Sequence, residues 1–126
     1  MGTSLNRPVN LNLTTLNFPI TAIVSILHRI SGITLFILLP YILYYLQLSL
    51  KNRASFTALK TNLSGAGSKI IIFMFLCSII YHFLAGIRHI IMDMGYGEDL
   101  QLARTSAMGV IALTGLLIIF LGFWIW

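Results

Sequence analysis

Two histidines and an arginine interrupt an otherwise apolar stretch of the chain, residues 78–99. His82 lies about eleven residues, roughly 16 Å along a helix, before Asp93, and would be deep in a membrane-spanning segment. A neutral or metal-bound imidazole is far less costly at that depth than a charged one. Such a histidine either bonds to a neighbouring helix or serves as an axial ligand to a haem, and the residues alone leave both interpretations open.

His89 follows His82 by seven residues, so the two share a helix face about 10 Å apart and cannot ligate one metal ion. No further histidine is expected at the depth of His82, so a six-coordinate haem iron would need its second axial ligand from another chain. Gly86 removes side-chain bulk on the same face, where either a cofactor ring or a packed helix could come close.

A second set of polar residues lies near the start of the first apolar segment. Ser25 and Arg29 are four residues apart and share a helix face, so a hydroxyl and a guanidinium could point at one small polar ligand. The spacing suits a carbonyl or an anionic group. Alternatively, Arg29 reaches lipid phosphate and Ser25 bonds back to its own helix.

These residues must be positioned by membrane helices. The chain of 126 residues is 58% hydrophobic and 9% charged, with a mean hydropathy of +0.93, so it cannot cover a core with a water-compatible surface. Crossing the bilayer takes about 20 apolar residues, and three segments qualify: residues 20–50, 68–93 and 104–126. The sequence predicts an all-α integral membrane protein with one domain, residues 1–126, whose three helices form part of a heteromeric bundle.

The connections set the directions of the helices. Residues 51–69 form a polar connection in which Gly65 and Gly67 favour a break in the helix, and residues 94–99 form a short acidic loop. Successive spans must therefore alternate in direction. The opening of the first span and the close of the second then lie toward the same membrane face, with their polar residues: Ser25, His28, Arg29, Arg88, His89 and Asp93.

Charge and composition limit the other possibilities. The net charge of +5 is typical of anchoring at lipid headgroups, and no basic stripe with interleaved aromatics indicates nucleic-acid binding. The single cysteine, Cys77, excludes an intrachain disulfide. Basic residues are balanced between the two sides, so the charge count does not settle orientation. Trp124 and Trp126 fit an interfacial aromatic anchor.

Two motifs carry a family resemblance. The segments SILHRISG (residues 25–32) and HFLAGIRHIIMD (residues 82–93), preceded by Arg7 and Pro8, closely resemble the cytochrome b subunit of succinate dehydrogenase, respiratory complex II. The resemblance implies that His82 is an axial ligand of haem b, with the other ligand supplied by a histidine of a second small membrane subunit. It also implies that Ser25 and Arg29 belong to a ubiquinone site.

The resemblance further places four cationic or titratable side chains near the haem propionates: His28, Arg29, Arg88 and His89. It implies partnership with an iron–sulfur subunit and a flavoprotein subunit, and electron transfer from succinate to ubiquinone in the tricarboxylic acid cycle. It places the chain in a bacterial inner membrane with a cytoplasmic N-terminus, or in the mitochondrial inner membrane. Asp93 matches an acidic position of unspecified role. The alternatives are an anchor of a quinol:fumarate reductase and a non-redox transporter or scaffold subunit.

Overall fold

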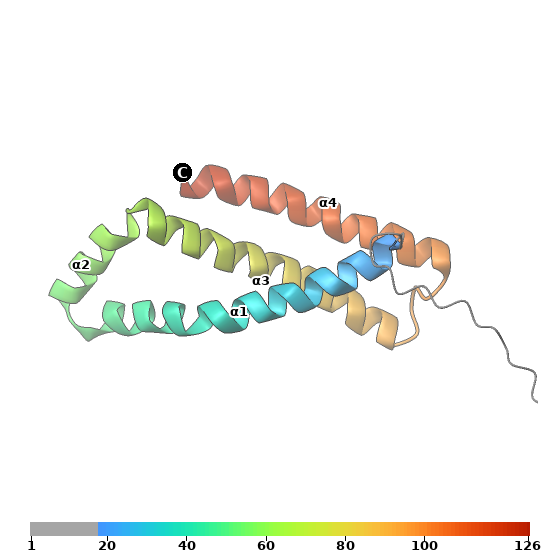
Figure 1. Cartoon of the computed structure of the whole chain (residues 1–126), viewed down its shortest axis with the longest axis horizontal. Coiled ribbons are helices and arrows are strands. Elements are labelled where there is room, and N and C mark those ends of the chain that lie inside the picture. The colour runs from blue at the N-terminus through green and yellow to red at the C-terminus, as the bar shows by residue number, and fades with distance from the viewer. Residues whose placement is uncertain (1–17) are drawn as a thin grey trace, which may run out of the picture.

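The computed structural model describes residues 18–126, and within them all regular structure is helical (Figure 1). The Arg7–Pro8 motif lies outside the described residues. The four helices are α1 (Ile20–Lys51), α2 (Arg53–Leu63), α3 (Ala66–Asp93) and α4 (Leu100–Ile125). Of these, α1, α3 and α4 are long and apolar enough to cross a membrane. The prediction of an all-α integral membrane protein with three spans is confirmed.

The helix α2 was not predicted, because the connection between the first two spans reads as polar. It begins after Asn52, whose side-chain oxygen accepts a hydrogen bond from the backbone N–H of Ser55 at 2.8 Å. It is held to the rest of the molecule by Leu59, which is buried. The expected break falls at Ser64 and Gly65, whereas Gly67 lies inside α3.

The third span begins four residues earlier than the predicted start at residue 104. Asp99 caps it, since its carboxylate accepts from the backbone N–H groups of Gln101 at 3.1 Å and Leu102 at 3.4 Å. The cap fixes the point at which the acidic loop turns back into the membrane. The opening of α4 therefore lies beside the closing turns of α3 (Figure 1).

The core is small and lies toward the end of the bundle where α1 begins. Val24, Ala85 and Ala107 are fully buried and come from α1, α3 and α4 respectively. Small side chains at such a meeting point let membrane helices approach closely. Most large apolar side chains instead face outward, as expected for contact with lipid or partner helices. This packing places the polar residues of α1 and α3 against one another.

Candidate functional site

The three histidine rings form one stack between α1 and α3. The ring of His28 lies between those of His82 and His89, with centroid distances of 4.1 Å and 4.9 Å and interplanar angles of 13° and 20°. The expectation that no other histidine lies at the depth of His82 is wrong. It followed from counting each residue from its own helix end, whereas the register of α1 against α3 decides which rings meet.

Two glycines make this contact possible. A Cβ added to Gly32 of α1 would lie 3.1 Å from Cε1 of His82, and one added to Gly86 of α3 would lie 3.3 Å from Nε2 of His28. The ring of His82 thus lies over Gly32 of α1, and the ring of His28 lies over Gly86 of α3. The space predicted beside Gly86 is taken by the imidazole of His28.

The hydrogen bonds of His82 fix its tautomer. Its Nδ1 lies 3.2 Å from the backbone carbonyl oxygen of His28 and 3.0 Å from Oγ of Ser31. Because a carbonyl only accepts, Nδ1 carries the proton. The Ser31 hydroxyl donates to the same carbonyl at 2.7 Å, so it is free to accept from His82. This arrangement leaves the lone pair on Nε2 of His82, as in histidines that ligate metals through that atom.

The ring of His82 would be a single protein ligand. Within residues 18–126, no group of three or more His, Cys, Asp or Glu side chains could hold a metal ion. A free divalent ion in a structural site takes several protein ligands, whereas a haem iron needs only axial ones. The donor set on this chain therefore fits a haem better than a bare ion.

The remaining polar residues at this end of the bundle divide between two places. His89 donates through Nδ1 to the carbonyl oxygen of Ala85 at 2.9 Å, and its Nε2 lies 3.4 Å from Oγ of Ser25. Ser25, His89 and Asp93 line a hollow of about 320 Å³ between α1 and α3. Arg29 is exposed and does not line this hollow, so Ser25 meets His89 more closely than it meets the guanidinium.

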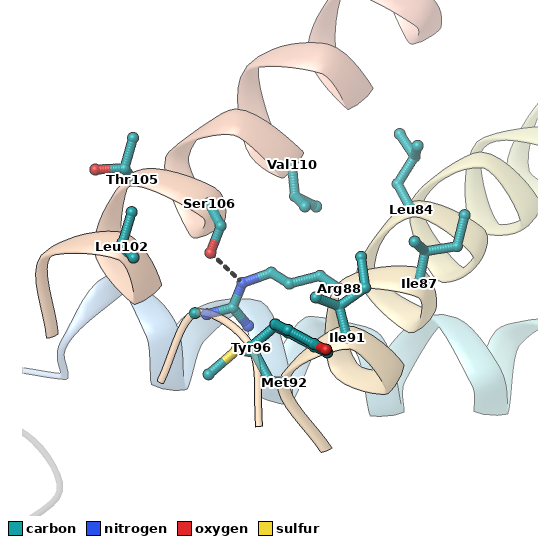
Figure 2. A pocket seen from close by; sticks show the side chains of 11 residues that line it. Leu84, Ile87, Arg88, Ile91, Met92, Tyr96, Leu102, Thr105, Ser106 and Val110 are labelled. Carbon is teal, nitrogen blue, oxygen red and sulfur yellow. Dashed lines mark hydrogen bonds between the residues drawn. The ribbon is translucent and has the colours of Figure 1, made fainter. Parts of the chain in front are cut away.

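Arg88 also borders the hollow beside His89, but the hydrogen bonds of its guanidinium group are made to α4. Arg88 is 8% exposed, and its Nε donates to Oγ of Ser106 at 3.0 Å (Figure 2). Its Nη2 donates to the carbonyl oxygen of Ala103 at 3.1 Å. The sequence placed Arg88 with His89 at the membrane rim but gave no sign of its contacts with α4. These hydrogen bonds hold α3 against α4.

Two further residues that the sequence did not single out support the site. Ser31, inside the motif of residues 25–32, bonds to the ligand candidate His82. The Tyr81 hydroxyl, from α3, donates to the carbonyl oxygen of Val24 in α1 at 2.9 Å. The position of Ser31 three residues after His28 was the available signal, since a serine there can bond to the His28 carbonyl.

Comparison with known proteins identifies the family. Residues 3–124 match the family described as the succinate dehydrogenase/fumarate reductase transmembrane subunit. The succinate dehydrogenase cytochrome b556 subunit of Coxiella burnetii is 40% identical over 121 residues, which cover 95% of this chain and 97% of the relative. The cytochrome b556 subunit of Paracoccus denitrificans is 31% identical, over 85% of this chain and 82% of the relative.

A more distant relative also matches over most of its length. The succinate dehydrogenase cytochrome b560 subunit of Porphyra purpurea is 29% identical over 93% of this chain and 95% of the relative. The match thus extends over all three spans and both motifs. The chain belongs to the family of succinate dehydrogenase/fumarate reductase transmembrane subunits.

Proposed function

We propose that this chain is the membrane-anchoring cytochrome b subunit of a succinate:ubiquinone oxidoreductase. It anchors a flavoprotein subunit and an iron–sulfur subunit to a bacterial inner membrane, or to the mitochondrial inner membrane, with its N-terminus on the cytoplasmic or matrix side. The relatives described above are named as succinate dehydrogenase subunits, which supports this direction. The family description also names fumarate reductase, so an anchor working in the reverse direction is the second candidate.

The tautomer of His82 is the observation that carries the haem proposal. His82 holds its Nδ1 proton on the His28 carbonyl and would bind the iron of haem b through Nε2, and the haem would supply a one-electron redox centre. The rings of His28 and His82 stack face to face, so their nitrogen atoms do not face each other across a space that could hold a haem iron. The second axial ligand is therefore assigned to a second small membrane subunit.

The rim of the site supplies positive charge. His28, Arg29, Arg88 and His89 are the candidates for pairing with haem propionates, which need cations nearer the membrane surface. His89, four residues before the end of α3, lies nearer the membrane surface than His28, whose ring lies at the depth of His82. Arg88 has its Nε and Nη2 groups engaged on α4, so its contribution would come from the remaining N–H groups.

Ser25 and Arg29 are proposed to bind ubiquinone at the same end. The serine hydroxyl donates to a quinone oxygen, and the guanidinium stabilises the negative charge that develops on the quinone during reduction. Because His89 has its Nδ1 proton on the Ala85 carbonyl, its Nε2 accepts from the Ser25 hydroxyl at 3.4 Å, and the hydroxyl would turn from Nε2 to the quinone oxygen when quinone binds. Arg29 is free to face a ligand shared with the iron–sulfur subunit because it is exposed on this chain.

Replacement of the axial ligand tests the haem assignment. In the purified complex, His82→Ala is expected to lower the dithionite-reduced b-type haem absorbance at least about tenfold, because the iron loses a protein ligand. Phe83→Ala, at the next and 64% exposed position of the same helix, is the matched control and should retain most of the haem. Equal loss in both variants, or no b-type band in the parent complex, would refute the assignment.

Replacement of the cation tests the quinone site separately. Arg29→Ala is expected to slow succinate-dependent quinone reduction by about 100-fold, the scale of a lost electrostatic stabiliser, while succinate oxidation by an artificial dye is unchanged. Arg104→Ala removes another exposed cation at the same end of the bundle and should leave both activities intact. Parallel loss of both activities in Arg29→Ala would mean that the residue serves assembly.

A further inference from the structure

A hollow between α3 and α4 lies apart from the histidine stack. Its volume is about 480 Å³. Its deeper wall is apolar and includes Leu84, Ile87 and Val110, whereas its rim carries Tyr96 and the pair Arg88–Ser106 (Figure 2). The hollow is thus polar near the membrane surface and apolar toward the middle of the bilayer. An occupant should carry a polar head at the rim and an apolar chain below it.

Arg88 sets the charge of that head. The side chain is 92% buried, and both of its hydrogen-bond acceptors, the Ser106 hydroxyl and the Ala103 carbonyl, are neutral. None of the described residues that line this hollow is acidic, and Asp93 borders the smaller hollow between α1 and α3 that Arg88 also lines. A buried guanidinium without a counter-anion is costly, and its remaining N–H groups are donors suited to phosphate oxygens. Charge complementarity therefore favours an anionic occupant.

The depth of Arg88 matches a phospholipid headgroup. Helix α3 has 28 residues and is about 42 Å long, close to the full thickness of a bilayer with its headgroups. Arg88 lies five residues before the last residue of α3, about 7 to 8 Å from that end, which is near the boundary of the hydrocarbon. Leu84 lies one turn deeper, where an acyl chain would run.

We propose that the α3–α4 hollow binds one anionic phospholipid, with its phosphate on Arg88 and an acyl chain over Leu84 and Val110. The bound lipid supplies the missing counter-charge and fills the space between the two helices. The site shares Arg88 with the proposed haem-propionate partners, so its test leaves Arg88 in place and changes other residues that line the hollow.

A carboxylate placed in the hollow tests this site. Leu102 lines the hollow and is 59% exposed, so Leu102→Glu supplies an internal counter-anion for Arg88 without removing a core side chain. Gln101→Glu is the matched control, since it adds the same charge at the same depth outside the hollow. Each assembled complex is stripped of lipid in detergent, supplied with phosphatidylglycerol or phosphatidylcholine, and examined by native mass spectrometry.

The parent complex and Gln101→Glu are expected to retain phosphatidylglycerol at least about tenfold better than phosphatidylcholine, and Leu102→Glu is expected to lose this preference. Equal retention of both lipids by the parent, no lipid retained, or an unchanged preference in Leu102→Glu would overturn the proposal. If Leu102→Glu does not assemble, Thr105→Glu, at another exposed position that lines the hollow, gives the same readout. Haem absorbance recorded on the same samples separates failure of the lipid site from failure of the proposed function.

Discussion

Polar side chains join α1 to α3 at both ends of the bundle. The two networks differ in which polar groups they leave without a hydrogen-bond partner. At the histidine end, stacked imidazoles rest on glycines and His82 keeps a free nitrogen. At the opposite end, the hydroxyls of Tyr45 and Ser68 both donate to Oδ1 of Asn62 at 2.8 Å, and Tyr41 donates to Tyr45.

The opposite-end network is formed by hydroxyl and amide groups that bond to one another. It ties α2 to α1 and α3 and needs no ligand to complete it. A polar network across membrane helices therefore does not by itself indicate a site. The distinguishing features are a nitrogen with an available lone pair, as in His82, and a buried charge without a counter-ion, as in Arg88.

The largest effect is expected where the histidine stack has no room to adjust. Gly32→Val places a Cβ 3.1 Å from Cε1 of His82 and should displace the ring, with an overpacking cost of about 1–3 kcal/mol. We expect haem content per complex, measured by absorbance, to fall several-fold. Gly109→Val is the control because a Cβ there meets nothing within 4 Å. Unchanged haem in Gly32→Val would mean that the stack is not required.

A smaller effect is expected from the serine that supports His82. Ser31→Ala removes one acceptor from Nδ1 but leaves the His28 carbonyl, so haem affinity should fall only about twofold, less than is usual when the sole orienting partner of a ligand is removed. Haem retention during dilution measures this. Thr34→Ala is the control, since the Thr34 hydroxyl bonds within its own helix to the Ile30 carbonyl. An equal response of the two variants would remove the special role of Ser31.

The smallest effect is expected at the opposite end. Tyr45→Phe removes a donor to Asn62 and should lower stability by about 1 kcal/mol, the usual net contribution of one hydrogen bond, with haem content unchanged. Thermal unfolding of the detergent-solubilised complex, followed by circular dichroism, measures the change. Tyr44→Phe, at an exposed position, is the control. Loss of haem in Tyr45→Phe would break the contrast between the two ends.

Much of the fold could be predicted because its signals are local. Span length and apolarity identified α1, α3 and α4, and the short acidic loop required α4 to run antiparallel to α3. The helix α2 was missed because its polar composition resembles a loop, and its stability depends on the Asn52 cap and on burial of Leu59. The early start of α4 depends in the same way on a cap, that of Asp99.

The candidate site was predictable in its members but not in its contacts. The sequence identified the histidines and placed Arg88 and His89 at one end of the bundle. It did not reveal that His28 touches His82, that Ser31 bonds to the same ring, or that Arg88 turns toward α4. The motif of residues 25–32 and its counterpart in α3 contain every partner of His82, but the pairing crosses two helices.

The sequence by itself determined that the chain is a three-span membrane protein with its histidines toward one end, because hydropathy and loop length can be evaluated along the chain without knowing how the helices pack. Only the tertiary structure decided which faces of the helices meet. Membrane helices are apolar nearly all round, so composition does not fix their rotation. Close packing at Ala85 and Ala107 and at the glycines Gly32 and Gly86 sets that rotation, and with it the imidazole stack and the direction of Arg88.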